Sequence, residues 1–278
     1  MNDSNALMVE NRVIQFPEPE PEYDCRRCND VGYLIVDTPG HPLDGKPYPC
    51  PDCERGQEYS RQWYAKYVKQ SGLPEHYQRM TFATFEKLPK EQRQGKMLGY
   101  HAAKLFVERR DHRFTLGDIY KRADPKHSGF KNDVARNSLV LYGAYGVGKT
   151  GLAAAIVNSM VGELVLYVRV QDLIRAVQKT YDRDYEGESR DALIWRIKGA
   201  PMLVLDEFGL QNISADRNEI MEEIMRYRCG RELPFVATTN DSPDVFRSKW
   251  DGRIVEVMLE AAHWIPLDEP VLRNQVQV

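Results

Sequence analysis

The amino-acid sequence predicts an α/β fold, with a parallel β-sheet covered by helices on both faces and a small cysteine-rich domain before it. From residue 138 onward, short and almost continuously apolar segments alternate with helical ones. Strands of this kind are buried on both sides, as in a parallel sheet between two layers of helices. A glycine-rich turn follows the first of these strands, and two pairs of cysteines lie far upstream, within residues 25–53.

The predicted elements divide the chain into three parts. Residues 1–22 form an acidic tail that is predicted to be disordered, residues 23–72 form a head, and residues 73–278 form the α/β domain. Residues 111–137 are a polar, basic excursion in which no helix is predicted. The predicted strands cover residues 138–142, 164–170, 202–205, 234–238 and 264–267. The predicted helices cover residues 58–71, 91–110, 149–160, 171–181, 193–197, 216–228 and 243–259, and the first of them carries aromatic residues along one side.

Composition limits the class of protein. The 278 residues carry a net charge of −3, and their apolar and charged fractions are ordinary for a soluble globular protein. Residues 55–126 contain sixteen Lys or Arg against eight Asp or Glu, which suits an anionic partner such as nucleic acid. A solvated basic surface is the alternative.

The sequence contains no predicted membrane segment. No apolar run approaches the ~20 residues that span a bilayer, and the N-terminus does not resemble a secretory signal. We therefore expect a cytoplasmic protein that does not enter membranes.

The glycine-rich turn matches the phosphate-binding pattern G-x-x-x-x-G-K-[ST]. It reads Gly143, Ala144, Tyr145, Gly146, Val147, Gly148, Lys149, Thr150, and Gly151 follows in an Ala-rich helix. Glycines let successive backbone N–H groups turn toward phosphate oxygens, and the helix N-terminus adds the positive end of its dipole. Lys149 is expected to reach the β- and γ-phosphates, and the Thr150 hydroxyl to bind magnesium. The loop predicts a site for ATP with Mg²⁺; a chance glycine-rich turn is the alternative.

Polar side chains follow two of the later strands. Asp206 and Glu207 come directly after an apolar strand, at the carboxyl edge where ligands bind in such sheets. We expect Asp206 to hold the magnesium through water, and Glu207 to orient and deprotonate the water that attacks the γ-phosphate. Asn240 ends a further strand, where its amide can sense the γ-phosphate. The alternatives are a solvated turn for the two acids and a helix cap for Asn240.

The cysteines form two C-x-x-C pairs, Cys25 with Cys28 and Cys50 with Cys53. This spacing is close to that of a four-cysteine zinc site, in which four thiolates surround the metal and leave no open position. A head of this size needs such a structural metal because its own apolar core is small. A dithiol redox pair or unrelated free thiols are the alternatives. Cys229 stands apart and is expected to be a small buried residue.

These motifs, taken in order, resemble the DnaC/DnaI-type replicative helicase loaders, which are AAA+ ATPases of the initiator clade. The resemblance covers roughly residues 23–275. It rests on the cysteine-rich head, on Ser71-Gly72-Leu73-Pro74, and on the phosphate loop. The segments LVLDEFGLQ, MRYR and PFVATTN continue it.

The resemblance implies an AAA+ core of five parallel strands with active sites shared between subunits. By position, Lys149 and Thr150 match the nucleotide-binding residues, Asp206 and Glu207 the acidic pair, and Asn240 the first sensor. Tyr181 lies where similar loaders carry an aromatic residue that binds single-stranded DNA; a core aromatic is the alternative. The implied function is an ATPase that binds the replicative DNA helicase and helps to place it on single-stranded DNA. The chain would form a homo-oligomer or assemble on a helicase ring, with the head and helix 58–71 as the helicase-binding part.

The sequence departs from the family pattern at one position. Residues 251–258 resemble a stretch that carries two arginines four residues apart, but only Arg253 is present and Val257 occupies the second position. Arg253, or Arg226 and Arg228, is expected to supply a positive charge to the neighbouring subunit. Arg273 matches a C-terminal sensor arginine only faintly. The alternative functions are an IstB-type transposition helper ATPase, which is not expected to have the cysteine head, and a nucleotide-dependent adaptor without hydrolysis.

Overall fold

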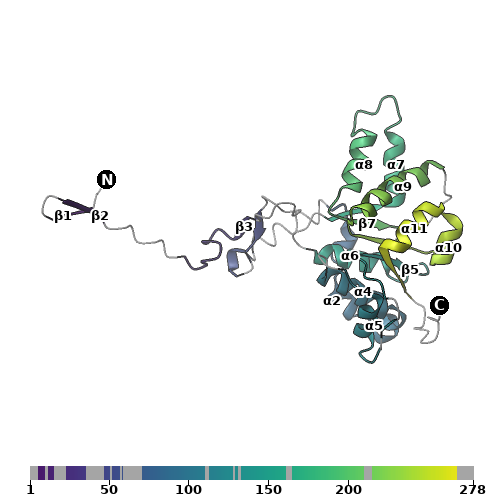
Figure 1. Cartoon of the computed structure of the whole chain (residues 1–278), viewed down its shortest axis with the longest axis horizontal. Coiled ribbons are helices and arrows are strands. Elements are labelled where there is room, and N and C mark those ends of the chain that lie inside the picture. Colours follow the sequence, from purple (N-terminus) through teal and green to yellow (C-terminus); the bar gives the residue numbers. More distant parts are fainter. Residues whose placement is uncertain are drawn as a thin grey trace.

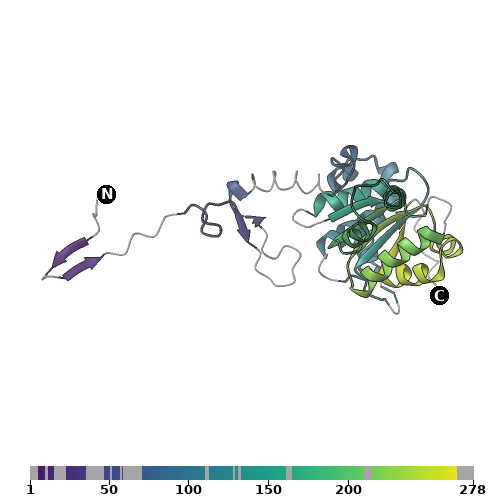
Figure 2. The same cartoon turned by 90° about the horizontal axis from the view of Figure 1, so that it is seen from above.

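The structure is a computed structural model. It describes residues 6–9, 12–15, 23–35, 47–50, 52–56, 58, 71–109, 113–127, 129–130, 133–160, 165–209 and 215–267. Most of these residues form one α/β body in which helices cover both faces of a sheet (Figures 1 and 2).

The sheet confirms the predicted fold class. Its five strands lie in the order β6-β7-β8-β5-β9, and all neighbouring pairs are parallel. The strands are β5 (Ser138–Tyr142), β6 (Val165–Arg169), β7 (Met202–Asp206), β8 (Phe235–Thr239) and β9 (Ala262–Pro266). Each lies within three residues of its predicted bounds. The strand that leads into the phosphate loop is therefore flanked by β8 and β9.

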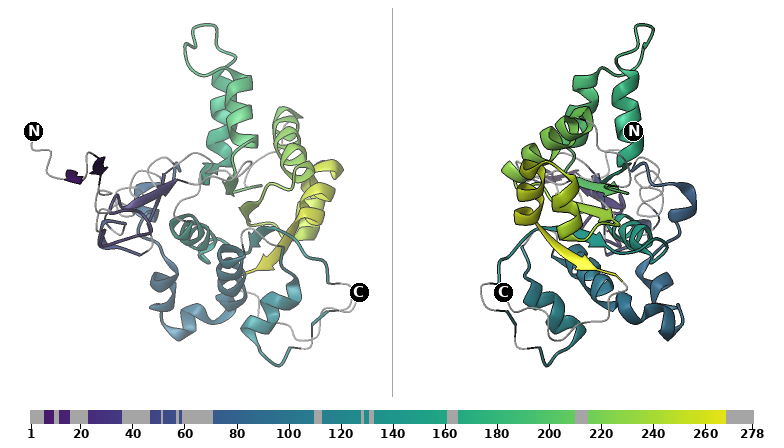
Figure 3. Two further views of the ribbon diagram at one scale, coloured as in Figure 1. Left: turned by 60° about the vertical axis from the view of Figure 1, so that its left-hand side comes forward. Right: turned by 90° about the vertical axis from the view of Figure 1, so that its right-hand side faces the viewer.

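The two faces of the sheet have separate cores because successive side chains of a strand point to opposite sides. In β7, Met202 and Val204 pack into one core, whereas Leu203 and Leu205 pack into the other. The first face is covered by α2 (Phe82–Glu86), α4 (Met97–Glu108), α5 (Leu116–Ala123) and α6 (Lys149–Ser159). The second is covered by α7 (Val170–Lys179), α8 (Arg190–Lys198), α9 (Ala215–Gly230), α10 (Pro243–Lys249) and α11 (Gly252–Ala261). Helices α7 and α8 form an antiparallel pair that stands out from the body (Figure 3).

Three helical predictions differ from the structure. The predicted helix 91–110 is broken at Gly95, whose φ of +23° interrupts the helical backbone. It is replaced by α3 (Lys90–Arg93), the short 3-10 helix η2 (Gln94–Lys96) and α4. Helix α5 lies in the excursion where none was predicted. The predicted helix 243–259 is two helices, because the chain turns at Trp250 and Asp251 caps α11.

The chain enters the α/β body along the outer strand β6. The backbone N–H of Tyr167 donates to the carbonyl of Ser71 at 2.6 Å, so this turn covers an edge that would otherwise be open. Gly72 has a φ of +80°, and a Cβ there would lie 2.8 Å from the Tyr167 carbonyl oxygen. Glycine is therefore required at this position. The 3-10 helix η1 (Glu75–Tyr77) follows.

The tail and head are described only in part. In the tail, β1 (Ala6–Val9) pairs antiparallel with β2 (Arg12–Gln15), so the prediction of disorder is wrong for these residues. Both are rich in apolar residues and precede the acidic proline run, which lies outside the described residues. In the head, β3 (Tyr33–Ile35) pairs with β4 (Pro47–Pro49). The predicted helix 58–71 lies almost entirely outside the described residues. None of the helices that the structure describes is both long and apolar enough to cross a bilayer.

Candidate nucleotide and metal sites

A cavity of about 310 Å³ lies at the carboxyl edge of the sheet, where β5, β7 and β8 end. Eight of the predicted site residues line it: Tyr145, Gly146, Gly148, Lys149, Thr150, Gly151, Glu207 and Asn240. Parallel strands bring their carboxyl ends to the same edge, which explains how residues far apart in sequence meet here. Tyr77 and Met80, which precede α2, also line the cavity. They were not predicted, because nothing in their sequence context indicates a ligand.

The phosphate loop has the backbone that the motif requires. Gly143, Gly146 and Gly148 have φ values of +148°, +78° and +98°. A Cβ at Gly143 would lie 2.4 Å from the Leu267 carbonyl oxygen, so that glycine also lets two segments approach closely. The Lys149 Nζ donates to the carbonyls of Gly143 and Ala144 at 2.9 and 2.7 Å. Its ammonium is thus held within the loop, next to the place where phosphate oxygens bind.

Asp206 is held at the end of β7 by three hydroxyl groups. The Thr150 and Thr238 Oγ1 atoms donate to its Oδ1 at 3.0 and 2.5 Å, and the Tyr167 hydroxyl donates to its Oδ2 at 2.5 Å. Asp206 is almost fully buried. Burial and the Asp206 charge raise the pKa of Tyr167, so the phenol keeps its proton and remains a donor. Thr150 and Asp206 bring a hydroxyl and a carboxylate oxygen together, which is a donor set that suits Mg²⁺.

Glu207 adopts a strained backbone conformation. Its φ is +59°, which is uncommon for a residue other than glycine, and its N–H donates to Thr238 Oγ1 at 3.0 Å. Its carboxylate forms an ion pair with Arg169, with 3.4 Å between Oε2 and Nη2. Burial lowers the pKa of Arg169, but the charges of Glu207 and Asp172 raise it above its usual value. The strained turn thus brings Glu207 to the cavity wall, directly after the buried Asp206.

Asn240 follows β8 and lines the cavity. The residue that caps α10 is Ser242, whose side chain accepts from the Val245 N–H. The alternative interpretation of Asn240 as a helix cap is therefore wrong. The next residue, Asp241, is buried and its carboxylate is paired with Lys249 at 2.5 Å. This pair fixes the turn that carries Asn240.

The four cysteines of the head lie together as the spacing predicts. Their Sγ atoms all lie within 4.8 Å of one another, with 3.7 Å between Cys25 and Cys50 and 3.6 Å between Cys28 and Cys53. Tetrahedral zinc with Zn–S bonds of ~2.3 Å requires sulfur atoms about 3.8 Å apart, so the donor set fits this metal. Burial raises the pKa of Cys28, but a hydrogen bond from the Gly32 backbone and those of the neighbouring thiols bring it to about 7. A backbone hydrogen bond from Asp52 lowers the pKa of Cys50, but burial and the neighbouring thiols raise it above its usual value, so of these two thiols Cys28 more readily becomes a thiolate.

The remaining predicted residues separate into exposed and buried groups. The Tyr181 side chain is 61% exposed and accepts from Arg190 Nε at 3.3 Å, so the core alternative is wrong. Arg228 is fully buried and donates to the carbonyls of Lys198, Ala200 and Pro234. It cannot supply charge to another subunit, and that prediction is wrong. Arg226 and Arg253 are exposed.

Cys229 and Arg273 are the two remaining residues that the sequence singled out. Cys229 is half-buried, and burial raises the pKa of its thiol to about 11, which makes it unreactive. Arg273 lies outside the described residues.

Comparisons with known proteins identify the family of this chain. Residues 86–262 match the family described as IstB-like ATP binding protein, and the chain belongs to that family. The replicative helicase loader DnaC of Escherichia coli K12 is 28% identical over 142 residues, which cover 50% of this chain and 57% of DnaC. The loader DnaI of Bacillus subtilis 168 is 28% identical over 111 residues, which cover 38% of this chain and 34% of DnaI. The matched segments thus span only about a third to a little over half of these relatives.

Solved structures share the fold. A crystal structure of the DnaC helicase loader superposes with a TM-score of 0.52 at 20% identity, covering 70% of this chain and 99% of that one. The replication initiator DnaA bound to AMPPCP and single-stranded DNA gives a TM-score of 0.52 at 18% identity, covering 71% of this chain and 51% of that one. Identities this low establish the AAA+ fold alone.

Proposed function

We propose that this member of the IstB-like ATP binding proteins is an ATP-hydrolysing loader that binds a replicative DNA helicase and assists its placement on single-stranded DNA. The observation that carries the hydrolytic part is the arrangement at the carboxyl edge of the sheet. There the Thr150 hydroxyl and the Asp206 carboxylate lie 3.0 Å apart, and Lys149, Glu207 and Asn240 line the same cavity. Phosphoryl transfer needs positioning and charge stabilisation more than covalent chemistry, and these residues supply both.

Each residue has a role in this proposal. The loop amides and Lys149 would bind the phosphates, and Thr150 and Asp206 would hold Mg²⁺, which neutralises charge on the phosphates when bound. Glu207 would accept a proton from the attacking water, and Asn240 would hold that water or the γ-phosphate. Because the Glu207 carboxylate is paired with Arg169, it must leave this ion pair before it can act as a base.

The helicase partner is proposed from the similarity to DnaC and DnaI and from the head. The four cysteines lie outside the segment that matches the ATP-binding family. We propose that they hold a structural zinc and that the head, with the segment up to residue 72, forms the helicase-binding domain. A rigid metal-stapled module on its own part of the chain suits protein recognition, because its surface is ordered before binding.

Single-stranded DNA is proposed to contact the projecting α7–α8 pair. Tyr181, Tyr185 and Trp195 are 61%, 39% and 59% exposed, and all three belong to this pair or its connection. Exposed aromatic rings are suitable for stacking with unpaired bases irrespective of sequence. Six basic residues of the pair are balanced by six acidic ones, so stacking rather than net charge would provide most of the affinity.

A second candidate function is a transposition helper of the IstB type. The family match favours it, because that match covers strands β5 to β8 and ends at the first residue of β9. A transposition helper function, however, leaves the cysteine head without a role. A loader needs a domain that recognises the helicase, and the head provides one.

Two measurements test the proposal. Glu207→Gln should bind ATP with unchanged affinity and lose turnover, whereas Lys149→Ala should lose binding. If wild type binds ATP but shows no turnover with or without single-stranded DNA and helicase, the chain is a nucleotide-dependent adaptor.

Co-purification tests the helicase partner. Wild type should retain the replicative helicase, whereas the double variant Cys25→Ser/Cys28→Ser should lose it while still binding ATP. Failure of wild type to bind the helicase, combined with binding to a transposase, would favour the second candidate.

A further inference from the structure

The proposed contact of single-stranded DNA with α7 and α8 leaves the basic excess of residues 55–126 without a role. Part of that excess lies between residues 79 and 96, on and around α2, α3 and η2. This stretch has two acidic side chains, Glu86 and Glu91. Its five basic side chains are those of Arg79, Lys87, Lys90, Arg93 and Lys96.

None of these five cations forms an ion pair with an acid among the described residues. Glu86 is engaged by α4 instead, because its carboxylate accepts from the Tyr100 hydroxyl and pairs with Lys104 at 3.3 Å. The hydrogen bonds from Tyr100 and Lys104, together with the charge of Arg93, lower the pKa of Glu86. Glu86 is therefore ionised, but its charge is already matched by Lys104.

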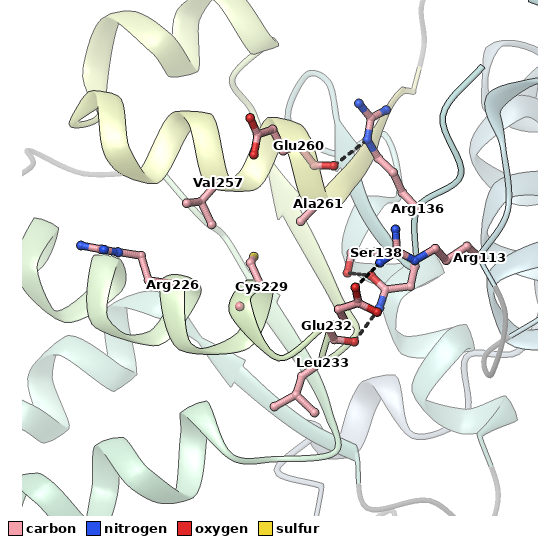
Figure 4. A pocket seen from close by; sticks show the side chains of 12 residues that line it. Arg113, Arg136, Ser138, Arg226, Cys229, Glu232, Leu233, Val257, Glu260 and Ala261 are labelled. Atoms are coloured by element: carbon pink, nitrogen blue, oxygen red, sulfur yellow. Dashed lines mark hydrogen bonds and ion pairs between the residues drawn. The ribbon is translucent and has the colours of Figure 1, made fainter. Parts of the chain in front are cut away.

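Cations elsewhere in the molecule show the opposite arrangement. Arg113 and Arg226 line a cavity of about 480 Å³ beside α9 and α11 (Figure 4). Arg113 pairs with Glu232 at 2.5 Å, and Arg226 pairs with Glu222 at 3.1 Å. Charges that are matched within a few ångströms create little field at a distance, whereas unmatched cations attract a polyanion.

Four of the five cations form a basic row, Lys87, Lys90, Arg93 and Lys96, with a spacing of three residues. Lys90 and Arg93 are three positions apart on α3 and therefore share one face of that helix. Lys87 directly follows α2, and Lys96 ends η2, so they flank this face on either side. Lys87 and Lys90 are exposed, whereas Arg93 is half-buried and its Nε is buried with no hydrogen-bond partner among the described residues. Such a group costs the fold free energy, which indicates a role outside the fold.

The surface around the basic row lacks apolar anchors. Among the described residues from 79 to 104, no large apolar side chain is exposed. Phe82, Phe85 and Tyr100 pack on one another, with ring centroids 4.9 Å apart for Phe85 and Tyr100 and 5.8 Å apart for Phe82 and Tyr100. Protein interfaces and membrane-bound helices depend on exposed aromatic or aliphatic groups, and single-stranded nucleic acid depends on free rings for stacking. Duplex DNA requires neither, because its phosphates provide about one charge per 1.7 Å of helix axis.

We propose that the basic row, with Arg79, binds the phosphate backbone of duplex DNA irrespective of base sequence. The row and the α7–α8 pair lie at opposite ends of the α/β body (Figure 3). A double-stranded and a single-stranded part of one DNA molecule would therefore be held at separate places. This inference goes beyond the proposed loader function, because it requires neither ATP hydrolysis nor a helicase.

The test measures binding of the full-length protein, without nucleotide or helicase, to a blunt duplex of about 20 base pairs over a series of salt concentrations. Four phosphate contacts predict that log K falls with log salt concentration at a slope of about −3.6. Lys87→Gln/Lys90→Gln removes two contacts, so the slope should become about −1.8 and the affinity at low salt should fall at least tenfold. Lys121→Gln/Lys126→Gln is the matched control, because it changes the net charge equally and both lysines are exposed. The control should stay within twofold of wild type.

Two other ligands separate duplex DNA from the alternatives. A single-stranded thymidine oligonucleotide of the same length should be weakened by Tyr181→Ala but only within threefold by Lys87→Gln/Lys90→Gln, and Tyr181→Ala should leave duplex binding within twofold. The inference is overturned if Lys87→Gln/Lys90→Gln binds the duplex as tightly as the control, or if it loses the single strand to the same degree. It is also overturned if wild type binds phosphatidylserine vesicles through these lysines and does not bind the duplex. Because ATP and helicase are absent, failure here is distinct from failure of the proposed loader function.

Discussion

The hydroxyl of Tyr167 offers a direct measure of how the acidic end of β7 is held. In Tyr167→Phe the ring stays, so no cavity forms, and only the 2.5 Å hydrogen bond to Asp206 Oδ2 is lost. Asp206 is 2% exposed, so water cannot easily replace the missing donor. A hydrogen bond to a charged group contributes about 1.5–3 kcal/mol, and for a domain of this size that corresponds to a Tm lowered by roughly 3–12 °C.

Urea unfolding and calorimetry of the nucleotide-free protein measure this loss. Tyr120→Phe is the control, because no hydrogen bond of its hydroxyl is seen among the described residues and its ring is half-buried against the same core. It should change the free energy of unfolding by less than about 0.5 kcal/mol. We also expect Tyr167→Phe to weaken MgATP binding more than binding of ATP without magnesium, because Asp206 is the proposed metal ligand. A Tyr167→Phe protein as stable as the control would refute this account of Asp206.

Three further predictions concern the metal, a buried charge and pH. Wild type should contain one zinc ion per chain by elemental analysis, and a chelator or Cys25→Ser should remove it. Loss of the metal should make the head sensitive to protease and leave ATP binding unchanged. A wild-type chain free of zinc would contradict the proposed site. Arg228→Met should lower the free energy of unfolding, measured by urea denaturation, by at least about 3 kcal/mol because three buried carbonyls lose their donor. The control Arg226→Met should unfold within about 0.5 kcal/mol of wild type. Burial lowers the pKa of His263, so below pH ~6.5 the unfolded chain binds more protons than the folded one. The Tm should therefore fall between pH 7 and 5, and it should fall less in His263→Gln. An equal fall in both proteins would exclude His263 as a cause of the pH dependence.

The sequence predicted the sheet and the residues of the two candidate sites because each depends on a local pattern. Apolar runs identify the strands, and the phosphate loop and the cysteine pairs have fixed spacings. Asp206 could be placed because it ends such a run. Tyr167 could not, because its role depends on β6 lying beside β7 with Arg169 opposite Asp206, and register between strands cannot be read from either strand alone.

Two other features that we did not predict correctly, helix α5 and the burial of Arg228, follow local sequence rules. Helix α5 begins with Thr115 and Asp118, which form a capping box in the structure, and this three-residue spacing was visible in the sequence. Arg228 differs from Arg226 by about 200° around the helix, since each residue advances about 100°. It follows Ile224 by four positions and Met225 by three, both of which are fully buried. Helical periodicity alone therefore indicated that only one of the two arginines faces solvent.

The contact between Ser71 and the outer strand β6 limits how far a bound partner can move. Ser71 is fixed to the sheet edge, and it follows Cys53 by 18 residues, so the head cannot lie more than about 60 Å from that edge even with a fully extended connection. A molecule held by the head is then confined at an effective concentration of about a millimolar around the α/β body. A contact between that molecule and the body could have a dissociation constant near this value and still be formed about half of the time. The affinity of the complex could therefore reside in the head, leaving the body free to engage and release as its nucleotide changes.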